Sequence, residues 1–124
     1  MASNKVFRLG PVYIASSAAN ICNPGTTTGG VHSTASPYGN LFILLRHIRI
    51  VNTTSGAVTF SLYIGATGGS TGGTEFIGTA LSIAPNSAYD WYGQVRLDVG
   101  DFLSGLASAG SSLTIVGEGE IGVA

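Results

Sequence analysis

Short runs of Val, Ile, Phe, Tyr and Thr, separated by Gly, Pro, Asn and Ser, recur along the whole 124-residue chain. Such runs are typical of β-strands, and few windows repeat apolar residues at the three- and four-residue spacing of a helix. The pattern predicts about eight strands, at residues 5–14, 18–22, 41–52, 57–65, 75–83, 87–99, 102–108 and 112–121. Mostly short connections favour antiparallel neighbours, and strands in this number close best as an antiparallel two-sheet sandwich or jelly roll, an all-β fold.

The strand at 57–65 alternates most cleanly between apolar and polar residues. We expect its apolar set to point inward and its polar set outward. The inward set is Val58, Phe60, Leu62 and Ile64, and the outward set is Thr59, Ser61 and Tyr63. The turn at 52–56 is expected to join this strand to the preceding one as a β-hairpin.

The strand at 41–52 does not alternate in this way. A strict period of two places Leu41, Ile43 and Leu45 on one face, and the other face carries Phe42, Leu44, Ile48 and Ile50. An antiparallel strand with one solvated face should alternate, so we expect a neighbouring subunit to cover the second face. Arg46 lies among apolar residues, and because an isolated buried guanidinium is costly, it should meet a carboxylate or reach an interface.

The remaining segments are irregular. Residues 23–40 show no periodicity, and a loop this long in a small domain is usually functional or a contact arm. We expect residues 1–9 and 23–40 to contact a partner. In a single domain, residues 1–39 would supply an N-terminal strand and an extended arm, and residues 40–124 the sandwich core. The glycine-rich segment 65–73 precedes a strand and lacks a Gly-Lys-Ser/Thr ending, which favours a flexible hairpin tip over a phosphate-binding loop.

Charge is scarce, at 9% of residues against about 25% in an ordinary soluble domain. Five basic and six acidic residues give a net charge of −1, so the chain lacks the basic footprint of a nucleic-acid-binding protein. A surface so weakly charged suits a protein that packs against copies of itself or against a larger partner.

The sequence also indicates the cellular compartment in which the chain is made. No run of about 18 apolar residues exists to span a membrane, and the first ten residues lack the apolar segment of a signal peptide. Cys22 is the only cysteine and allows no internal disulfide. We therefore expect synthesis in a cytosol and a small, buried role for Cys22.

Candidate chemistry is sparse. His32 and His47 cannot supply the ligand spacing of a zinc site, and no G-x-S-x-G context supports a Ser-His-Asp triad. We expect Asp101 to form a turn and the other acids to pair with arginines. Weaker alternatives are a calcium site near the acidic turn and a glycosidase-type carboxylate pair. The expectation is a protein without catalytic residues, metal or cofactor.

Aromatic residues gather at Tyr89, Trp91 and Tyr92. Such residues are more often core and interface anchors than a sugar-binding platform, although the platform remains an alternative. The candidate interface for copies of the chain or another partner therefore comprises Leu41, Phe42, Ile43, Leu44, Arg46, Tyr89, Trp91 and Tyr92.

Several segments of the last third form a characteristic series: IAPNS at 83–87 leading to Trp91, LDVGDFL at 97–103, GLAS at 105–108 and SLTIVGE at 112–118. With HIRIVN at 47–52 and the strand at 60–65, this region resembles small all-β virion proteins of tailed bacteriophages, in particular capsid decoration (cement) proteins. The resemblance covers residues 40–124 and brings no catalytic residues.

The resemblance implies a homotrimer, made in the host cytoplasm, that binds the major capsid protein at subunit junctions on the capsid surface and stabilises the head. It leaves two alternatives, a receptor- or carbohydrate-binding fibre or tail tip and a head–tail or tail structural component.

Overall fold

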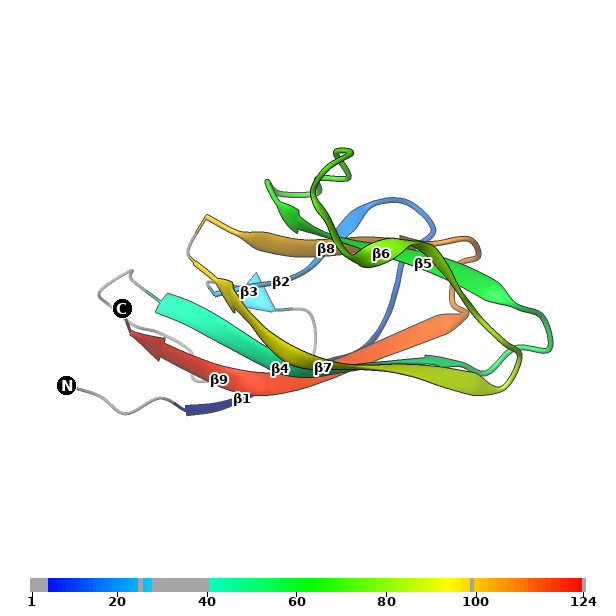
Figure 1. Cartoon of the computed structure of the whole chain (residues 1–124), viewed down its shortest axis with the longest axis horizontal. Helices are drawn as coiled ribbons and strands as arrows, with labels where there is room; N and C mark the ends of the chain where they lie inside the picture. Colours follow the sequence, from blue (N-terminus) through cyan, green and yellow to red (C-terminus); the bar gives the residue numbers. More distant parts are fainter. Residues whose placement is uncertain (1–4, 25, 28–40, 99, 124) are drawn as a thin grey trace.

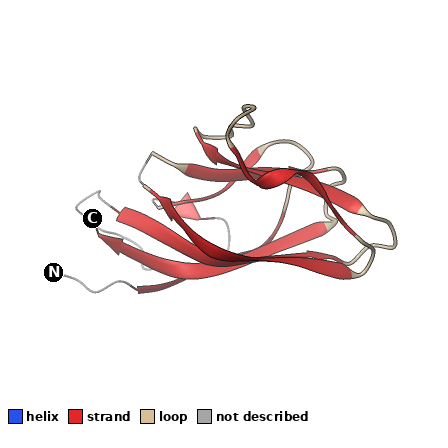
Figure 2. Ribbon diagram, in the orientation of Figure 1, coloured by secondary structure: helices blue, strands red, loops and turns tan. Residues whose placement is uncertain are grey.

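The computed structural model describes residues 5–24, 26–27, 41–98 and 100–123, and over these residues every regular element is a strand (Figure 2). The strands are β1 (Lys5–Tyr13), β2 (Ala19–Asn23), β3 (Thr26–Thr27), β4 (Leu41–Asn52), β5 (Val58–Gly65), β6 (Glu75–Ile83), β7 (Ser87–Leu97), β8 (Phe102–Ala107) and β9 (Leu113–Val123). The eight expected strands are confirmed to within two residues at most ends. The short β3 was not expected, because it lies inside the segment interpreted as loop. No helix capable of crossing a membrane occurs in the described ranges.

The strands form two antiparallel sheets, which confirms the two-sheet sandwich. Sheet A has the order β1-β9-β4-β7, and sheet B has the order β3-β2-β8-β5-β6. Figure 1 shows the two sheets stacked as layers, with sheet A below and sheet B above. The pairings couple β1 with β9, β2 with β8, β4 with β7 and β5 with β6.

The expected hairpin between β4 and β5 is wrong. β4 pairs with β7 and β9 in sheet A, and β5 pairs with β6 and β8 in sheet B. The turn at 53–57 therefore carries the chain from one sheet to the other. Both strands bury one apolar face, and these faces meet the same core from opposite sides, which a flat hairpin would not allow.

A β-bulge overturns the assignment of faces on β4. The register with both neighbours slips between Leu45 and His47, so one residue, Arg46, reverses the alternation. The buried side chains before and after the bulge consequently lie on the same face: Ile43, Leu45, Ile48 and Ile50 are all 0% exposed. The strict period of two therefore placed Ile48 and Ile50 on the wrong face, and of the apolar residues assigned to the second face only Phe42 and Leu44 point outward.

The core between the sheets draws on every long strand. β1 and β2 contribute Phe7, Leu9 and Ile21, so the sandwich core includes residues before position 40. Cys22 is buried as expected. The inward positions of β5 are confirmed, with Val58, Phe60 and Leu62 buried and Ile64 partly buried against the core.

The glycine-rich segment that follows β5 is tied down rather than free. The Asn20 side chain accepts a hydrogen bond from the backbone N–H of Gly68 (2.5 Å) and donates one to the Thr67 hydroxyl (2.8 Å). The Ser104 hydroxyl donates to the carbonyl of Gly69 (2.6 Å). In Figure 1 this green loop lies beyond sheet B, on the side away from sheet A. Two outward positions of β5, Ser61 and Tyr63, are buried, contrary to expectation.

A buried asparagine joins the turns at one end of the sandwich. Asn52, at the end of β4, is 0% exposed. Its amide nitrogen lies 2.9 Å from the carbonyl oxygen of Gly56 and 3.0 Å from that of Ile83. Its carbonyl oxygen accepts bonds from the backbone N–H (3.0 Å) and hydroxyl (2.7 Å) of Thr54. One side chain thus holds the β4–β5 turn to the end of β6.

Candidate functional site

The outer face of sheet A, the side turned away from the core, carries a row of side chains that crosses all four strands. Arg8 on β1 is opposite Glu118 on β9, Glu118 is opposite His47 on β4, and His47 is opposite Tyr92 on β7. Residues directly opposite in an antiparallel sheet point to the same face. The register alone therefore gathers a guanidinium, a carboxylate, an imidazole and a phenol.

His47 is the centre of this row. Its Nε2 lies 2.8 Å from Oδ1 of Asp90, and its Nδ1 lies 3.9 Å from Oε1 of Glu118. The Tyr92 ring stacks on the imidazole with a centroid distance of 4.5 Å and an interplanar angle of 7°. Arg49 Nη1 lies 3.5 Å from the other Asp90 oxygen. Because Asp90 is 43 residues from His47 in the sequence, no local spacing could predict this cluster.

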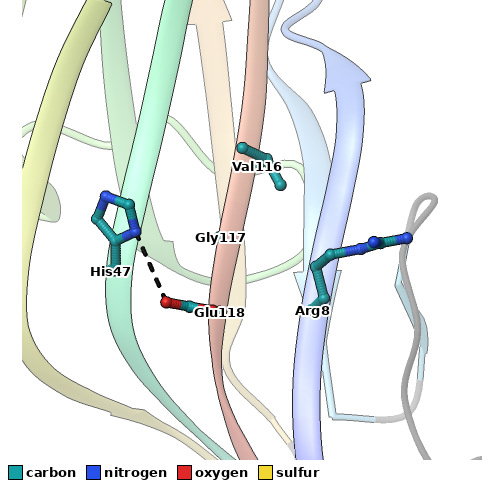
Figure 3. A pocket seen from close by; sticks show the side chains of 5 residues that line it. All are labelled: Arg8, His47, Val116, Gly117 and Glu118. Atoms are coloured by element: carbon teal, nitrogen blue, oxygen red, sulfur yellow. Dashed lines mark ion pairs between the residues drawn. The ribbon is translucent and has the colours of Figure 1, made fainter.

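A hollow of about 290 Å³ lies beside the cluster, lined by Arg8, His47, Val116, Gly117 and Glu118. In Figure 3 Glu118 turns toward His47, whereas the Arg8 side chain extends away from β9. Among the described residues, no carboxylate lies within ion-pair distance of Arg8. The lining contains an acid, a cation and an imidazole but no hydroxyl or thiol that could act as a nucleophile.

Two of the expected acid–arginine pairs are found on the surface, whereas Glu118 lies beside His47 and Glu75 accepts a hydrogen bond from the backbone N–H of Gly73. Arg46 meets Glu120 at 2.6 Å, so it finds the carboxylate that the sequence required. Arg96 pairs with Asp98 at 2.7 Å, and a carboxylate oxygen of Asp101 accepts the backbone N–H of Asp98 within the turn. The side chains of Arg46 and Glu120 are 50% and 34% exposed, so their pair contributes about 1 kcal/mol or less to stability.

Exposed apolar side chains and arginines concentrate on this same outer face. The described large hydrophobic residues with high exposure are Val6 (82%) and Tyr13 (60%) on β1 and Tyr92 (73%) on β7. The four arginines of the chain, Arg8, Arg46, Arg49 and Arg96, also lie on the strands of sheet A. Sheet B, in contrast, carries its own loop on its outer side.

No protein-family model, curated protein or solved structure matches this chain.

The structure separates the aromatic residues that the sequence grouped. Tyr89 packs against Phe60 (centroids 5.6 Å apart) and Trp91 against Phe76 (5.0 Å), both toward sheet B. Only Tyr92 of the three points outward, so they do not form one sugar-binding platform. Adjacent strand residues point to opposite faces, which separates Trp91 from Tyr92.

The remaining candidate interface residues on β4 do not share one environment. Phe42 lies beneath the guanidinium of Arg96, 4.4 Å from the carbon atom to the ring centroid, and Leu44 is half-buried. Ile43 belongs to the core and is removed from the candidate interface. The Leu41 side chain lies outside the described residues, as does His32.

Buried or clustered ligands for a metal are not found in the part of the chain that the structure describes. The thiol of Cys22 lies within the core, where burial raises its pKa from 9.0 to about 12, so it stays protonated and unreactive near neutral pH. The outer face of sheet A presents ion pairs, a stacked imidazole–phenol pair and exposed apolar side chains.

Proposed function

We propose that the chain is a non-enzymatic virion protein of a tailed bacteriophage, a decoration protein that docks on the major capsid protein through the outer face of sheet A. The observation that carries the proposal is the concentration of Val6, Tyr13, Tyr92 and the arginines on that single face. Exposed apolar groups rimmed by polar ones mark interaction surfaces, and aromatic residues and Arg are enriched in interfaces.

The order of the strands supports the proposal at the level of the fold. The first strand pairs with the last, and the following strands pair inward along the chain to the β5–β6 hairpin. We propose that this nested pairing is a jelly roll, an architecture found in viral capsid and lectin domains. Because one fold hosts many functions, the fold alone does not choose between these roles.

A role without catalysis is supported by what surrounds His47. Its contacts are two carboxylates and a stacked tyrosine, and the lining of the hollow beside it contains no hydroxyl or thiol for the imidazole to activate. A base needs a reacting group within hydrogen-bond reach, and here the imidazole is occupied in holding β4 to β7.

The proposed mechanism is binding to the assembled capsid in preference to its free subunits. A protein that binds only the assembled shell stabilises that state by mass action, and a contact of a few kcal/mol is repeated at every capsid junction. Surface complementarity suffices for this effect, and no chemical step is needed.

One observation still favours the alternative of a receptor- or carbohydrate-binding tip. Tyr92 is 73% exposed and stacks on His47, which in turn meets the carboxylates of Asp90 and Glu118, a combination that suits sugar hydroxyls and the apolar face of a sugar ring. Tyr89 and Trp91 no longer contribute to it, because both pack inward.

Deleting the gene from the phage that carries it tests the proposal. We expect complete particles that release DNA at a lower temperature, and recovery of the original release temperature when purified protein is added back. Mass spectrometry of purified wild-type particles should find this chain in hundreds of copies. Its absence from particles would overturn the proposal. Failure of the shell to assemble would indicate a core component, and stable particles that do not adsorb to cells would favour the receptor-binding alternative.

A further inference from the structure

We infer that residues 66–73 form a strap over sheet B that opens and closes while the sandwich stays folded, and that opening uncovers Tyr63. The strap belongs to the connection between β5 and β6 and lies outside sheet B in Figure 1. The inference goes beyond the proposed function, which rests on the opposite side of the molecule, the outer face of sheet A.

A row of four residues crosses sheet B beneath the strap. Asn20 on β2 is opposite Ser104 on β8, which in turn is opposite Tyr63 on β5. Glu75 on β6 is opposite Tyr63 on its other side. Residues directly opposite in an antiparallel sheet point to the same face, so the register alone lines up an amide, a hydroxyl, a phenol and a carboxylate on the outside of sheet B.

Both ends of this row hold the backbone of the strap. The side-chain oxygen of Asn20 accepts the N–H of Gly68 at 2.5 Å. At the other end, Oε1 of Glu75 accepts the N–H of Gly73 at 2.6 Å. The strap is thus fixed to β2 on one side and to β6 on the other.

The centre of the row is buried under the strap. Ser104 is 0% exposed, and its hydroxyl donates to the carbonyl oxygen of Gly69 at 2.6 Å. Tyr63 lies between Ser104 and Glu75 in the register and is 8% exposed, although its side chain is on the face turned away from the core. The strap therefore hides an aromatic ring and a hydroxyl that sheet B would otherwise present.

Few interactions hold the strap closed. Four of its eight residues are glycine, which loses more conformational freedom on ordering than any other residue. Ala66 is its single apolar residue, and the described hydrophobic core contains no residue of the strap. Asn20 and Glu75 are exposed, so water can replace the hydrogen bonds that they make to the strap.

Opening of the strap leaves the sandwich intact. The N–H of Ile64 donates to the carbonyl of Thr74 at 3.1 Å, which closes the β5–β6 connection below the strap. Segments with few apolar contacts and exposed hydrogen bonds open locally at a free energy far below that of global unfolding. Residues 66–73 have both properties, so their opening is separate from unfolding of the core.

Amide hydrogen exchange followed by NMR tests the inference. The N–H groups of Gly68 and Gly69 donate to Asn20 and Ala66, so their protection reports the closed strap. After correction for intrinsic rates, they should exchange at least about a hundredfold faster than the amides of Ile43 and Ile50 in the core strand β4. Dilute urea should leave the strap rates unchanged and raise the core rates, because strap opening exposes little surface.

Three substitutions give the direction of the effect. Ser104→Ala removes the bond to Gly69 and should speed exchange in the strap about threefold to tenfold. Ser108→Ala is the matched control, because the Ser108 hydroxyl accepts the N–H of Thr59 outside the strap, and strap exchange should not change. Gly72→Ala should slow strap exchange about twofold to fivefold, because no atom lies within 4 Å of the added Cβ and alanine restricts the open state.

Acetylation of Tyr63 by N-acetylimidazole, located by mass spectrometry, measures what opening uncovers. It should be slow in the wild type and should increase in Ser104→Ala by the same factor as strap exchange, with thermal melting showing that every variant is folded. Strap amides that exchange only with global unfolding overturn the inference, and so do strap amides without protection in the wild type. Equal behaviour of the two serine variants, or acetylation of Tyr63 that does not follow strap exchange, also overturns it. Each of these results leaves the proposed function standing, since that function does not involve sheet B.

Discussion

Replacing Asn52 by alanine tests the view that one buried amide holds the two sheets together at the turns. The carbonyl oxygen of Ile83 would lose the amide hydrogen now 3.0 Å away on nitrogen, and the backbone N–H of Thr54 would lose its acceptor. The carbonyl of Gly56 gains a replacement donor, because the Thr54 hydroxyl, which loses its acceptor on Asn52, lies 2.9 Å from it. The carbonyl oxygen of Ala84, 3.3 Å from the same nitrogen, also loses a donor, but Ala84 is exposed and water can replace it. Of the three backbone groups affected, the carbonyl of Ile83 and the N–H of Thr54 are therefore the two that carry the cost.

Each buried unsatisfied group costs about 1–3 kcal/mol, and Thr54 is only half-buried, so we expect Asn52→Ala to lower the free energy of unfolding by about 2–4 kcal/mol. That loss is a large fraction of the ~5–15 kcal/mol that stabilises an ordinary domain. It corresponds to a fall in Tm of roughly 10 °C for a chain of this size.

Urea unfolding followed by tryptophan fluorescence measures the loss, because Trp91 is the single tryptophan and packs against Phe76. Asn20→Ala is the matched control, since Asn20 also makes two hydrogen bonds but is exposed, and water can replace them. We expect it to cost less than about 1 kcal/mol. Equal losses in the two variants, or a loss below about 1 kcal/mol for Asn52→Ala at an unchanged m-value, would refute the reasoning.

Two further predictions concern the interior. A Cβ on Gly119 would overlap the carbonyl oxygen of Leu44 on β4. Gly119→Ala should therefore lower the free energy of unfolding in urea by more than about 3 kcal/mol. Gly56→Ala is the control, because no atom lies near its added Cβ, and it should change that free energy by less than about 1 kcal/mol. For Cys22, whose pKa burial raises from 9.0 to about 12, we expect no reaction with a thiol reagent at pH 8 until the chain unfolds. Because the unfolded thiol releases its proton first, the stability of the wild type relative to Cys22→Ala should be constant below about pH 9 and fall by up to about 1.4 kcal/mol per pH unit as the pH rises toward 12. Rapid labelling of the folded protein, or parallel pH profiles for the two proteins, would contradict this account.

The strand boundaries follow directly from local patterns. Runs of β-branched and aromatic residues between turn residues predicted β4 and β6 at their observed bounds, Leu41–Asn52 and Glu75–Ile83. The burial of Cys22 was also predictable, because the free energy of burying a small apolar group depends on the side chain itself. Arg46 meets a carboxylate as predicted, but not for the predicted reason, since its side chain is 50% exposed rather than buried.

The candidate site was much less accessible to prediction. His47 and Tyr92 were each noticed in the sequence, but their stacking and the contact with Asp90 depend on which strands pair and in what register. Arg8 was not selected at all, since nothing near it in the sequence suggests that β1 lies beside Glu118.

The amino-acid sequence by itself determined that the chain is all-β, where most strands begin and end, and that its surface is poor in charge, since these properties belong to individual residues and their immediate neighbours. Only the tertiary structure decided that β4 and β5 lie in different sheets, that a bulge at Arg46 turns Ile43 and Ile48 to the same side, and that the arginines gather on sheet A. Strand pairing is set by the joint burial of apolar faces far apart in the sequence, and one extra residue in a strand reverses every side chain after it.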